Sequence, residues 1–414
     1  MNATDVAIIG AGQAGLAMSR WLMKRNIDHL LFERGEVGGH WQSRAWHSLR
    51  LLTPNWLNGL PDSPYQGDDP EGFMRADAFH ARLRAYASAF SAPVLEQAEV
   101  FCIEFKNEAY CIRTSRGDWT ARAVVIATGQ CDRPHIPAIG LSLHERVANL
   151  HSSQYRSPSA LPSGNVLVIG ASASGVQIAE ELRRHGRDVT LAVGSHVRVP
   201  RTWRGRDIFW WMHRASILAA RTRDLPNAEA AGRQPTAQLA GRPDRANLDL
   251  STLQAQAVRL TGRLAAVDGD KISFQNDLRS TVECAQTRLD RLLARIDAFA
   301  GLEGKARPDA IVSVDLSREK TPSNLSLASE GIRTIIWATG YRRDFSWLRI
   351  CAAIRPDGDI AHRDGVTGIP GLYALGFRLL RKRDSHFIGG VGADAAAIAE
   401  EIAAFLDKNE RRAA

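Results

Sequence analysis

The sequence lacks the cysteine patterns and long apolar runs that mark several large classes of protein. Its five cysteines (102, 111, 131, 284 and 351) include no C-x-x-C pair, which argues against a redox dithiol and a zinc knuckle. An odd number fits a reducing compartment. No stretch approaches the roughly 18 apolar residues that cross a bilayer, and the first predicted strand begins too early for a signal peptide. We therefore expect a cytoplasmic protein with no metal site and no membrane partner.

Nucleic-acid-binding signatures are also missing, although the chain is basic. The formal net charge is +8, but the arginines are scattered and no RNP, zinc-finger or helix-turn-helix pattern appears. The surplus would attract phosphorylated cofactors, and no nucleic acid is expected as a partner. At 414 residues and 44% hydrophobic composition, the chain is too long for one ordinary core and predicts two or three domains.

What the sequence does contain is a dinucleotide-binding pattern near its start. The apolar run Val6–Ile9 predicts a buried strand, which leads into Gly10-x-Gly12-x-x-Gly15 and then a helix. Gly10 permits a tight turn, Gly12 lets the backbone approach a pyrophosphate, and Gly15 lets the helix pack on the strand. The free N–H groups at the helix N-terminus favour phosphates. Glu33 ends the next predicted strand and would bind a ribose 2′-hydroxyl, which FAD has and NADPH lacks.

A second pattern of the same kind begins at residue 166. The predicted strand 166–169 meets Gly170-x-Ser172-x-Ser174-Gly175, in which Ser172 takes the place of the middle glycine, and a helix follows. The closing glycine, Gly175, is retained. The sequence therefore predicts a second dinucleotide unit.

The strand that follows this second unit ends without an acid. Ser195 and His196 come directly after it, and Arg198 and Arg201 lie a few residues beyond. An acid there would repel a 2′-phosphate, whereas serine, histidine and arginine bind one. The second unit is therefore predicted to take NADPH, with NADH as the alternative. The competing interpretation is that the two arginines are ordinary solvated side chains.

Two Ala-Thr-Gly turns indicate how the units are connected. Residues 127–129 and 338–340 each follow a predicted strand, and the second glycine pattern lies between them. The prediction is an α/β fold with two Rossmann-like domains, the NADPH domain being inserted into a discontinuous FAD domain. The expected segments are 1–158 and 341–414 for FAD, and 159–340 for NADPH with a less readable insertion around 203–260.

Other elements follow from periodicity and turn chemistry. A helix is predicted over 76–90, an antiparallel meander over 98–126, and a hairpin around Asp268-Gly269. An amphipathic helix is predicted over 278–296, and an alanine-rich helix from about residue 393. These elements are expected to surround the two nucleotide units.

Three segments leave alternatives open. Trp41, in a Gly-Gly-His-Trp loop, could cover a planar ligand or pack in the core. The aromatic cluster of Trp203, Trp210 and Trp211 could line a substrate pocket, although such clusters are more often packing. The basic run 378–383 is interpreted as a solvated charged loop.

With these motifs the chain resembles the class B flavin-dependent monooxygenases, in particular the flavin-containing monooxygenases and the bacterial flavoproteins similar to them. The resemblance rests on the two glycine patterns with Glu33, on Gly38-Gly39-x-Trp41, and on Ala338-Thr339-Gly340-Tyr341. It covers nearly the whole chain. The last two motifs and the serine-containing second pattern are more specific to the monooxygenases than the first pattern is.

Two departures from the family pattern stand out. The family's Phe-x-Gly-x-x-x-His motif corresponds to 145–151, where Glu145 and Val147 replace the phenylalanine and the glycine, and His151 remains. Many members carry an active-site asparagine within 48–53, where this chain has none. Asn55 is offset from that position.

The resemblance implies an enzyme in which NADPH reduces FAD and dioxygen then forms a C4a-hydroperoxyflavin, shielded by NADP⁺. One oxygen atom would pass to a nitrogen, sulfur or carbonyl centre of a small organic substrate. Such chemistry requires exclusion of water and placement of the substrate, so no catalytic triad is expected and the catalytic side chains are not assigned. The alternatives are a flavoprotein reductase or dehydrogenase without oxygen insertion, and a non-catalytic nucleotide sensor. A homodimer is expected only because twofold dimers are the commonest assemblies.

The complete set of expected cofactor contacts combines both units. It comprises Gly10, Gly12, Gln13, Gly15, Glu33, Arg34, Gly39, Trp41, Thr53, Val100, Ala127, Thr128, Gly129, Gly170, Ser172, Ser174, Gly175, Ser195, His196, Arg198, Arg201, Ala338, Thr339, Gly340 and Phe387.

Overall fold

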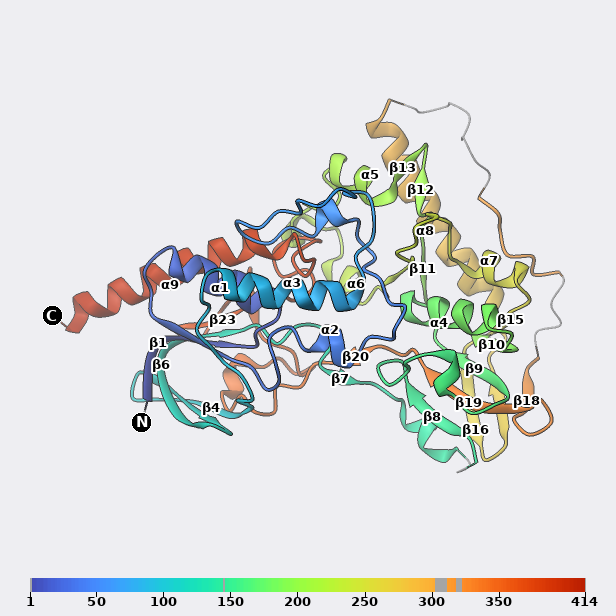
Figure 1. Ribbon diagram of the computed structural model, residues 1–414, viewed down its shortest axis with the longest axis horizontal. Coiled ribbons are helices and arrows are strands. Elements are labelled where there is room, and N and C mark those ends of the chain that lie inside the picture. Colours follow the sequence, from blue (N-terminus) through green and yellow to red (C-terminus); the bar gives the residue numbers. More distant parts are fainter. Residues whose placement is uncertain (1, 144–145, 302–310, 318–321, 414) are drawn as a thin grey trace.

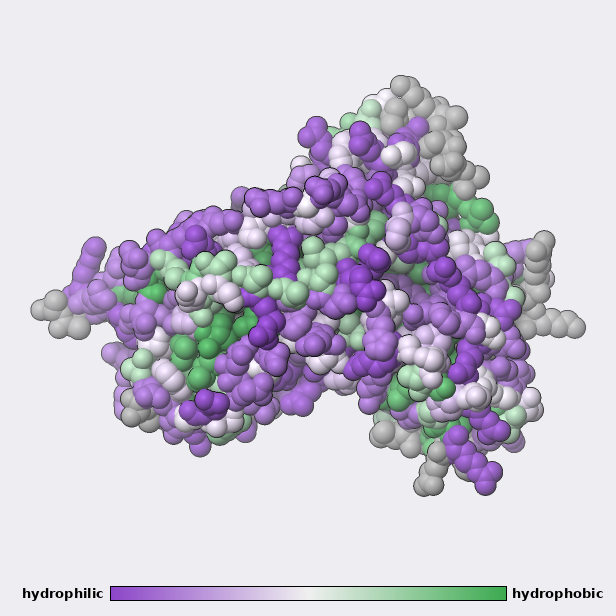
Figure 2. Space-filling model, in the orientation of Figure 1, coloured by the Kyte–Doolittle hydropathy of each residue, from purple (hydrophilic) through white to green (hydrophobic). Residues whose placement is uncertain are grey.

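The computed structural model describes residues 2–143, 146–301, 311–317 and 322–413, which form two lobes, each around its own β-sheet (Figure 1). In the same orientation the surface is largely hydrophilic, and its outline is indented between the lobes along the lower edge (Figure 2). Both termini of the described chain belong to the first lobe (Figure 1).

The sheet of the first lobe has the opening strand at its centre. Its spatial order is β21 (His362–Arg363), β22 (Val366–Thr367), β23 (Leu372–Ala374), β6 (Gly117–Ile126), β1 (Asn2–Ile9), β2 (His29–Phe32) and β3 (Val94–Leu95). Val6 aligns with Ala123 on one side and with His29 on the other, in parallel register. Residues Val6 to Ile8 are fully buried because helices cover this sheet, and a continuous apolar run is typical of such a strand.

Most of the remaining elements of the first lobe agree with the sequence predictions, but the short helix His40–Ser43 occupies part of a segment predicted as a loop. β4 (Val100–Lys106), β5 (Ala109–Thr114) and β6 form the predicted antiparallel meander. The helices are α1 (Gln13–Met23), α2 (His40–Ser43), α3 (Ala76–Ala89) and α9 (Val391–Ala413). The last helix packs against α1.

The second lobe repeats the strand–turn–helix arrangement. Its sheet runs in the order β15 (Arg259–Thr261), β10 (Val189–Ala192), β9 (Asn165–Ile169), β19 (Ile332–Trp337) and β8 (Ala148–His151). Every neighbouring pair is parallel. The helices α4 (Ala173–Arg184) and α7 (Leu250–Ala255) pack against each other. The predicted hairpin is present as β16 (Leu264–Asp268) and β17 (Lys271–Phe274), extended by β18 (Asn324–Ser326).

The chain passes between the lobes at two places that lie side by side. All strands of the second sheet lie between β6 and β23 in the sequence, so this lobe is an insertion. The crossing segments pair as β7 (Arg133–Pro134) and β20 (Tyr341–Arg342). β8 already belongs to the second sheet although it precedes the predicted boundary at residue 158, because β19 provides a free edge for it.

The region around 203–260, which the sequence left less readable, forms a cap beside the second sheet. It contains two ribbons and two short helices, namely β11 (Val197–Arg198) with β14 (Ala237–Gln238), β12 (Thr202–Trp203) with β13 (Arg206–Asp207), α5 (Ile208–Arg214) and α6 (Ala228–Gly232). The long helix α8 (Leu278–Phe299) packs on it through Leu289 and Leu293. Trp203 and Trp211 are buried in this cluster, so they serve packing.

Short 3-10 turns occupy Asn55–Leu57, Ala138–Ser142, Pro158–Ala160, Thr222–Asp224 and Cys351–Ala353. None of the described helices is long and apolar enough to span a membrane. The described residues also contain no group of three histidine, cysteine or acidic side chains placed to hold a metal ion. The five cysteines, all described, are unpaired.

Candidate nucleotide and substrate cleft

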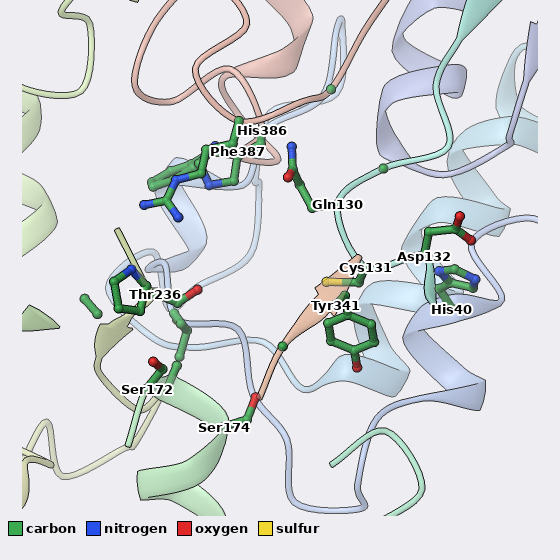
Figure 3. A pocket seen from close by; sticks show the side chains of 18 of the residues that line it. His40, Gln130, Cys131, Asp132, Ser172, Ser174, Thr236, Tyr341, His386 and Phe387 are labelled. Atoms are coloured by element: carbon green, nitrogen blue, oxygen red, sulfur yellow. The ribbon is translucent and has the colours of Figure 1, made fainter. Parts of the chain in front are cut away.

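A single cleft of about 1560 Å³ is lined by both lobes and by the cap. Its walls include the turns that follow β1 and β6 in the first lobe and β9 and β19 in the second. Figure 3 shows cleft side chains that follow β6, β9 and β19. These are the carboxyl ends of parallel strands, where α/β folds bind their ligands. The volume exceeds the roughly 300–1,000 Å³ of an ordinary small-ligand pocket, so the cleft has room for more than one ligand.

One glycine of the first glycine turn faces a space that contains no protein atoms. Gly10 has φ +106°, and a Cβ there would lie 2.8 Å from the Ala127 carbonyl oxygen. A Cβ on Gly15 would lie 1.9 Å from the Gly10 carbonyl oxygen, so close packing excludes any side chain. A Cβ on Gly12 would meet nothing within 4 Å. Gly12 lines the cleft at the N-terminus of α1, so this space fits the pyrophosphate of a dinucleotide.

The second glycine turn repeats these contacts closely. Gly170 also has φ +106°, and its Cβ would lie 2.5 Å from the Ala338 carbonyl oxygen. A Cβ on Gly175 would lie 1.8 Å from the Gly170 carbonyl oxygen. Ser172 and Ser174 line the cleft beside the N-terminus of α4 (Figure 3). Each Ala-Thr-Gly turn therefore packs against the first glycine of its own unit, which is a structural reason for its recurrence.

Glu33 is held at the end of β2 with its carboxylate beside the first turn. Its Oε2 accepts a hydrogen bond from the Ala11 N–H at 2.8 Å, and Oε1 accepts one from the Gly35 N–H at 3.0 Å. Glu33 also lines the cleft. The carboxylate is thereby fixed where a ribose hydroxyl could donate to it.

Arg34 links two cleft side chains that the sequence did not single out. Its Nη2 lies 2.8 Å from His40 Nε2 and 3.0 Å from Asp132 Oδ1. Burial, reinforced by the positive charges of Arg44 and Arg34, lowers the pKa of His40 to about 4. The imidazole is therefore neutral near pH 7 and accepts the hydrogen bond from Arg34. Figure 3 shows His40 and Asp132 beside each other.

Several predicted contacts have both a packing role and an exposed cleft face. The rings of Trp41 and Phe79 pack edge to face with their centroids 5.0 Å apart, and Trp41 also lines the cleft. Trp41 therefore packs in the core and is also placed to contact a ligand. Phe387 packs against Phe209 with ring centroids 5.8 Å apart. The Thr53 hydroxyl donates to Asn58 Oδ1 at 2.6 Å.

The arginines predicted to bind a 2′-phosphate are already committed to protein partners. Arg201 is 1% exposed, donates to the Leu52 carbonyl and forms a 2.7 Å ion pair with Asp207. It does not line the cleft, so the prediction that it contacts the cofactor is not supported by this geometry. Arg198 lines the cleft, but its guanidinium is buried and held by Asp249 at 2.7 Å.

His196 is also placed away from the cleft, whereas Ser195 lines it. The His196 ring is 2% exposed and contacts the Gly194 carbonyl at 3.1 Å. Arg263 Nη2 lies 3.3 Å from the Ser195 hydroxyl. The Arg263 side chain is half exposed, and its Nε lies 3.5 Å from Asp277 Oδ2. Arg263 directly follows β15, the neighbour of β10 in the sheet, and it escaped the sequence prediction because this adjacency is not visible along the chain.

Described residues at the positions compared with the family pattern have structural roles in this chain. The His151 ring contacts the Gly340 carbonyl through Nε2 at 2.9 Å and packs on Tyr341 at 5.0 Å, so it supports the second Ala-Thr-Gly turn. Glu145 lies outside the described residues. Asn55 is 5% exposed and donates to the Asp69 carbonyl at 2.9 Å, away from the cleft lining.

The basic run 378–383 is not the solvated charged loop that the sequence predicts. Arg378 and Arg383 are partly buried and line the cleft, so they are not a solvated charged surface. The loop folds inward after β23 and brings them beside Phe387, which is a tertiary effect with no local sequence signal. Arg381 and Lys382 do not line the cleft and instead lie near Asp394 and Asp384.

Most residues of the predicted cofactor-contact set line the cleft. The members that do not line the cleft are Gly15, Gly175, His196 and Arg201; all others do. Lining residues that the sequence did not assign include His40, Arg44, Gln130, Cys131, Asp132, Arg263, Tyr341, Arg378, Arg383 and His386.

Comparison with known proteins identifies the family. Residues 7–203 match the family described as pyridine nucleotide-disulphide oxidoreductase. The flavin-containing monooxygenase from Stenotrophomonas maltophilia shares the fold, with a TM-score of 0.68 at 20% identity over 98% of this chain and 100% of that one. A CzcO-like uncharacterized oxidoreductase from Geobacillus kaustophilus is 31% identical over 400 residues, covering 96% of this chain and 98% of the relative. The chain belongs to the family of CzcO-like oxidoreductases, and its fold is similar to that of a flavin-containing monooxygenase.

A rice protein is a further relative of the chain, at lower identity. The indole-3-pyruvate monooxygenase YUCCA1 of Oryza sativa is 27% identical over 418 residues, which cover 95% of this chain and 90% of the relative. The chain is a flavin oxidoreductase that also uses a nicotinamide nucleotide. The two glycine turns facing one cleft agree with this cofactor pair.

Proposed function

We propose that this enzyme is an NADPH-dependent FAD monooxygenase that transfers one oxygen atom from O₂ to a small organic substrate. The observation that carries the proposal is the shared cleft, into which two glycine turns of equal geometry open from opposite lobes. The bound flavin would supply electron transfer from the nicotinamide and the reaction with dioxygen. The chain's own residues bind, orient and exclude water.

The residues divide between the two cofactors by lobe. FAD would lie along Gly12 and the N-terminus of α1, with Glu33 accepting from its ribose. NADPH would lie along Ser172, Ser174 and the N-terminus of α4. The FAD-binding domain would then comprise the segments before β8 and from β20 onward, close to the predicted limits of 158 and 341.

Some of the matching proteins are named monooxygenases, although bacillithiol disulfide reductases share the fold as well. The Stenotrophomonas and rice proteins carry monooxygenase names and match over nearly the whole chain. The five cysteines form neither a C-x-x-C motif nor a disulfide, so the thiol chemistry of a dithiol reductase has no carrier here. A reductase that avoids oxygen transfer is the second candidate, since the matching family is described as pyridine nucleotide-disulphide oxidoreductase.

The reaction of the reduced enzyme with oxygen separates these candidates. The purified holoenzyme is reduced with NADPH without air and then mixed with oxygenated buffer. A monooxygenase is expected to regain the oxidised flavin spectrum slowly while NADP⁺ remains bound, because the cleft excludes water and delays release of hydrogen peroxide. Immediate return of the oxidised spectrum with one hydrogen peroxide per flavin would exclude the proposal.

Arg263 is predicted to determine the preference for NADPH over NADH. The variant Arg263→Ala should raise the KM for NADPH about tenfold with little change for NADH, since a charge-assisted contact is worth about 1.5–3 kcal/mol and this side chain is half exposed. The matched control is Arg259→Ala, which removes an arginine of β15 that pairs with Glu330. Equal changes for both nucleotides would exclude a role in 2′-phosphate binding.

A further inference from the structure

One wall of the cleft gathers positive side chains that have no negative partner among the described residues. Arg378 and Arg383 come from the loop after β23, and Arg295 comes from α8. Within the described ranges, no carboxylate lies within 4.0 Å of any of these three guanidinium groups. Arg378 donates to the Gln234 carbonyl, whereas Arg383 Nε is buried without a hydrogen-bond partner.

These side chains act on one another electrostatically. Burial lowers the pKa of Arg378, and the neighbouring Arg383 lowers it further. Arg383 is affected in the same way by burial and by Arg295. Because arginine stays protonated in proteins, the result is a concentrated positive potential rather than neutral groups. His386 joins this wall as a neutral ring, since burial and Arg378 hold its pKa at about 4.

The nearby carboxylates lie within 4.0 Å of other cations of the loop rather than of Arg378 or Arg383. Asp384 Oδ1 lies 3.3 Å from Lys382 Nζ, and Asp394 Oδ1 lies 3.9 Å from Arg381 Nε. Asp394 is 1% exposed, and neither it nor Asp384 lines the cleft. The loop thus directs its unpaired cations toward the cleft and its paired charges away from it.

An apolar surface adjoins the cations. Phe209, Met212, Ile217, Leu218 and Leu292 line the same cleft. The two surfaces are held together by backbone hydrogen bonds from Arg383 N–H to the Ala220 carbonyl at 3.1 Å and from Asp384 N–H to the Leu218 carbonyl at 3.2 Å. A ligand that satisfies both surfaces is negatively charged at one end and apolar along its body.

We propose that the substrate is an amphipathic organic acid whose carboxylate is bound by Arg378 and Arg383 and whose apolar part lies against Phe209 and its neighbours. Paired guanidinium groups recognise a carboxylate with directed, charge-assisted hydrogen bonds. Cationic amines are disfavoured by the same wall. As a statement about the substrate, the inference rests on the proposed monooxygenase function.

The phosphates of the nicotinamide cofactor are the competing anion, and the proposed assignment puts them at Ser172 and Ser174 rather than at this wall. The charge of Arg288 lowers the pKa of His196, so Arg288 lies near the loop that follows β10. Arg295 is seven residues further along α8, or about 10 Å at 1.5 Å per residue. Figure 3 likewise shows His386 and Phe387 at a distance from Ser172 and Ser174.

Equilibrium binding to the oxidised holoenzyme saturated with NADP⁺ tests the proposal. Phenylacetate and its neutral analogue phenylacetamide are titrated calorimetrically. Phenylacetate should bind at least tenfold more tightly, and Arg378→Gln and Arg383→Gln should each remove this preference without changing the affinity for phenylacetamide. Lys382→Gln is the matched control, because it removes a charge from the same loop but outside the cleft lining. Arg383→Lys, which keeps the charge, should retain part of the preference.

Two results would overturn the proposal. Equal or absent binding of the two probes would show that the wall does not select carboxylates. A loss of NADP⁺ affinity in Arg378→Gln and Arg383→Gln, with the carboxylate preference unchanged, would assign the cations to the cofactor. Because the oxidised enzyme carries out no oxygen chemistry, selective carboxylate binding together with hydrogen peroxide as the sole oxygen product would reject the monooxygenase function and leave the anion site intact.

Discussion

Replacing Gly12 by valine is expected to give a folded protein that no longer retains its flavin. The backbone at Gly12 has φ −81° and ψ −169°, an extended conformation that any residue adopts, so valine introduces no backbone strain. A Cβ there meets no protein atom within 4 Å, so the fold is undisturbed. The new side chain instead occupies the space assigned to the pyrophosphate. We expect FAD to bind at least about a hundredfold more weakly, which corresponds to roughly 3 kcal/mol.

Two further variants distinguish lost binding from lost folding. Gly15→Ala would place its Cβ 1.9 Å from the Gly10 carbonyl oxygen, so it should disrupt the turn and reduce soluble, folded protein. Ser172→Val changes the equivalent position of the second unit and should keep the flavin while weakening NADPH. The measurements are the flavin-to-protein absorbance ratio after dialysis and the thermal unfolding of each apoprotein. A Gly12→Val protein that keeps one flavin per chain would contradict the assignment.

The glycine turns could be predicted because their constraints are local. Gly10 and Gly15 interact within six residues of sequence, and strand periodicity on either side fixes the direction of the chain. The insertion of one unit into the other could also be predicted, because Ala127 and Ala338 follow strands that must lie beside the respective glycine turns. Both inferences need only the order of short motifs along the chain.

The side chains of the cleft were harder to predict because tertiary partners decide their roles. The sequence offers Arg201 and Arg263 as equal positive charges, and only the positions of Asp207 and Ser195 separate the buried one from the one facing the cleft. The sequence likewise predicts Arg378 and Arg383 as solvated, because nothing along the chain shows their tertiary partners. Their orientation depends on a loop that packs on the segment around Leu218, far away in the sequence.

Removing Asp207 is expected to destabilise the protein by about 3–5 kcal/mol, since it leaves the Arg201 charge buried and unpaired. Both side chains are 1% exposed and lie 2.7 Å apart. Asp207 also accepts a hydrogen bond from the Phe209 N–H at 2.8 Å and so caps α5. Urea unfolding of Asp207→Ala measures the loss. The comparison is Arg355→Ala, which breaks a surface pair whose side chains are 51% and 61% exposed and should change stability by less than about 1 kcal/mol.

The double variant Arg201→Met/Asp207→Ala separates the structural role of Arg201 from a role in cofactor binding. With the buried charge removed, the double variant should be more stable than Asp207→Ala alone, because methionine packs between Phe73 and Phe209 where the guanidinium now lies over both rings. The ratio of the KM values for NADPH and NADH should remain that of the unmodified enzyme, since Arg201 does not line the cleft. A selective rise in the KM for NADPH would instead return Arg201 to the 2′-phosphate site, and the buried ion pair would then have to open when the cofactor binds.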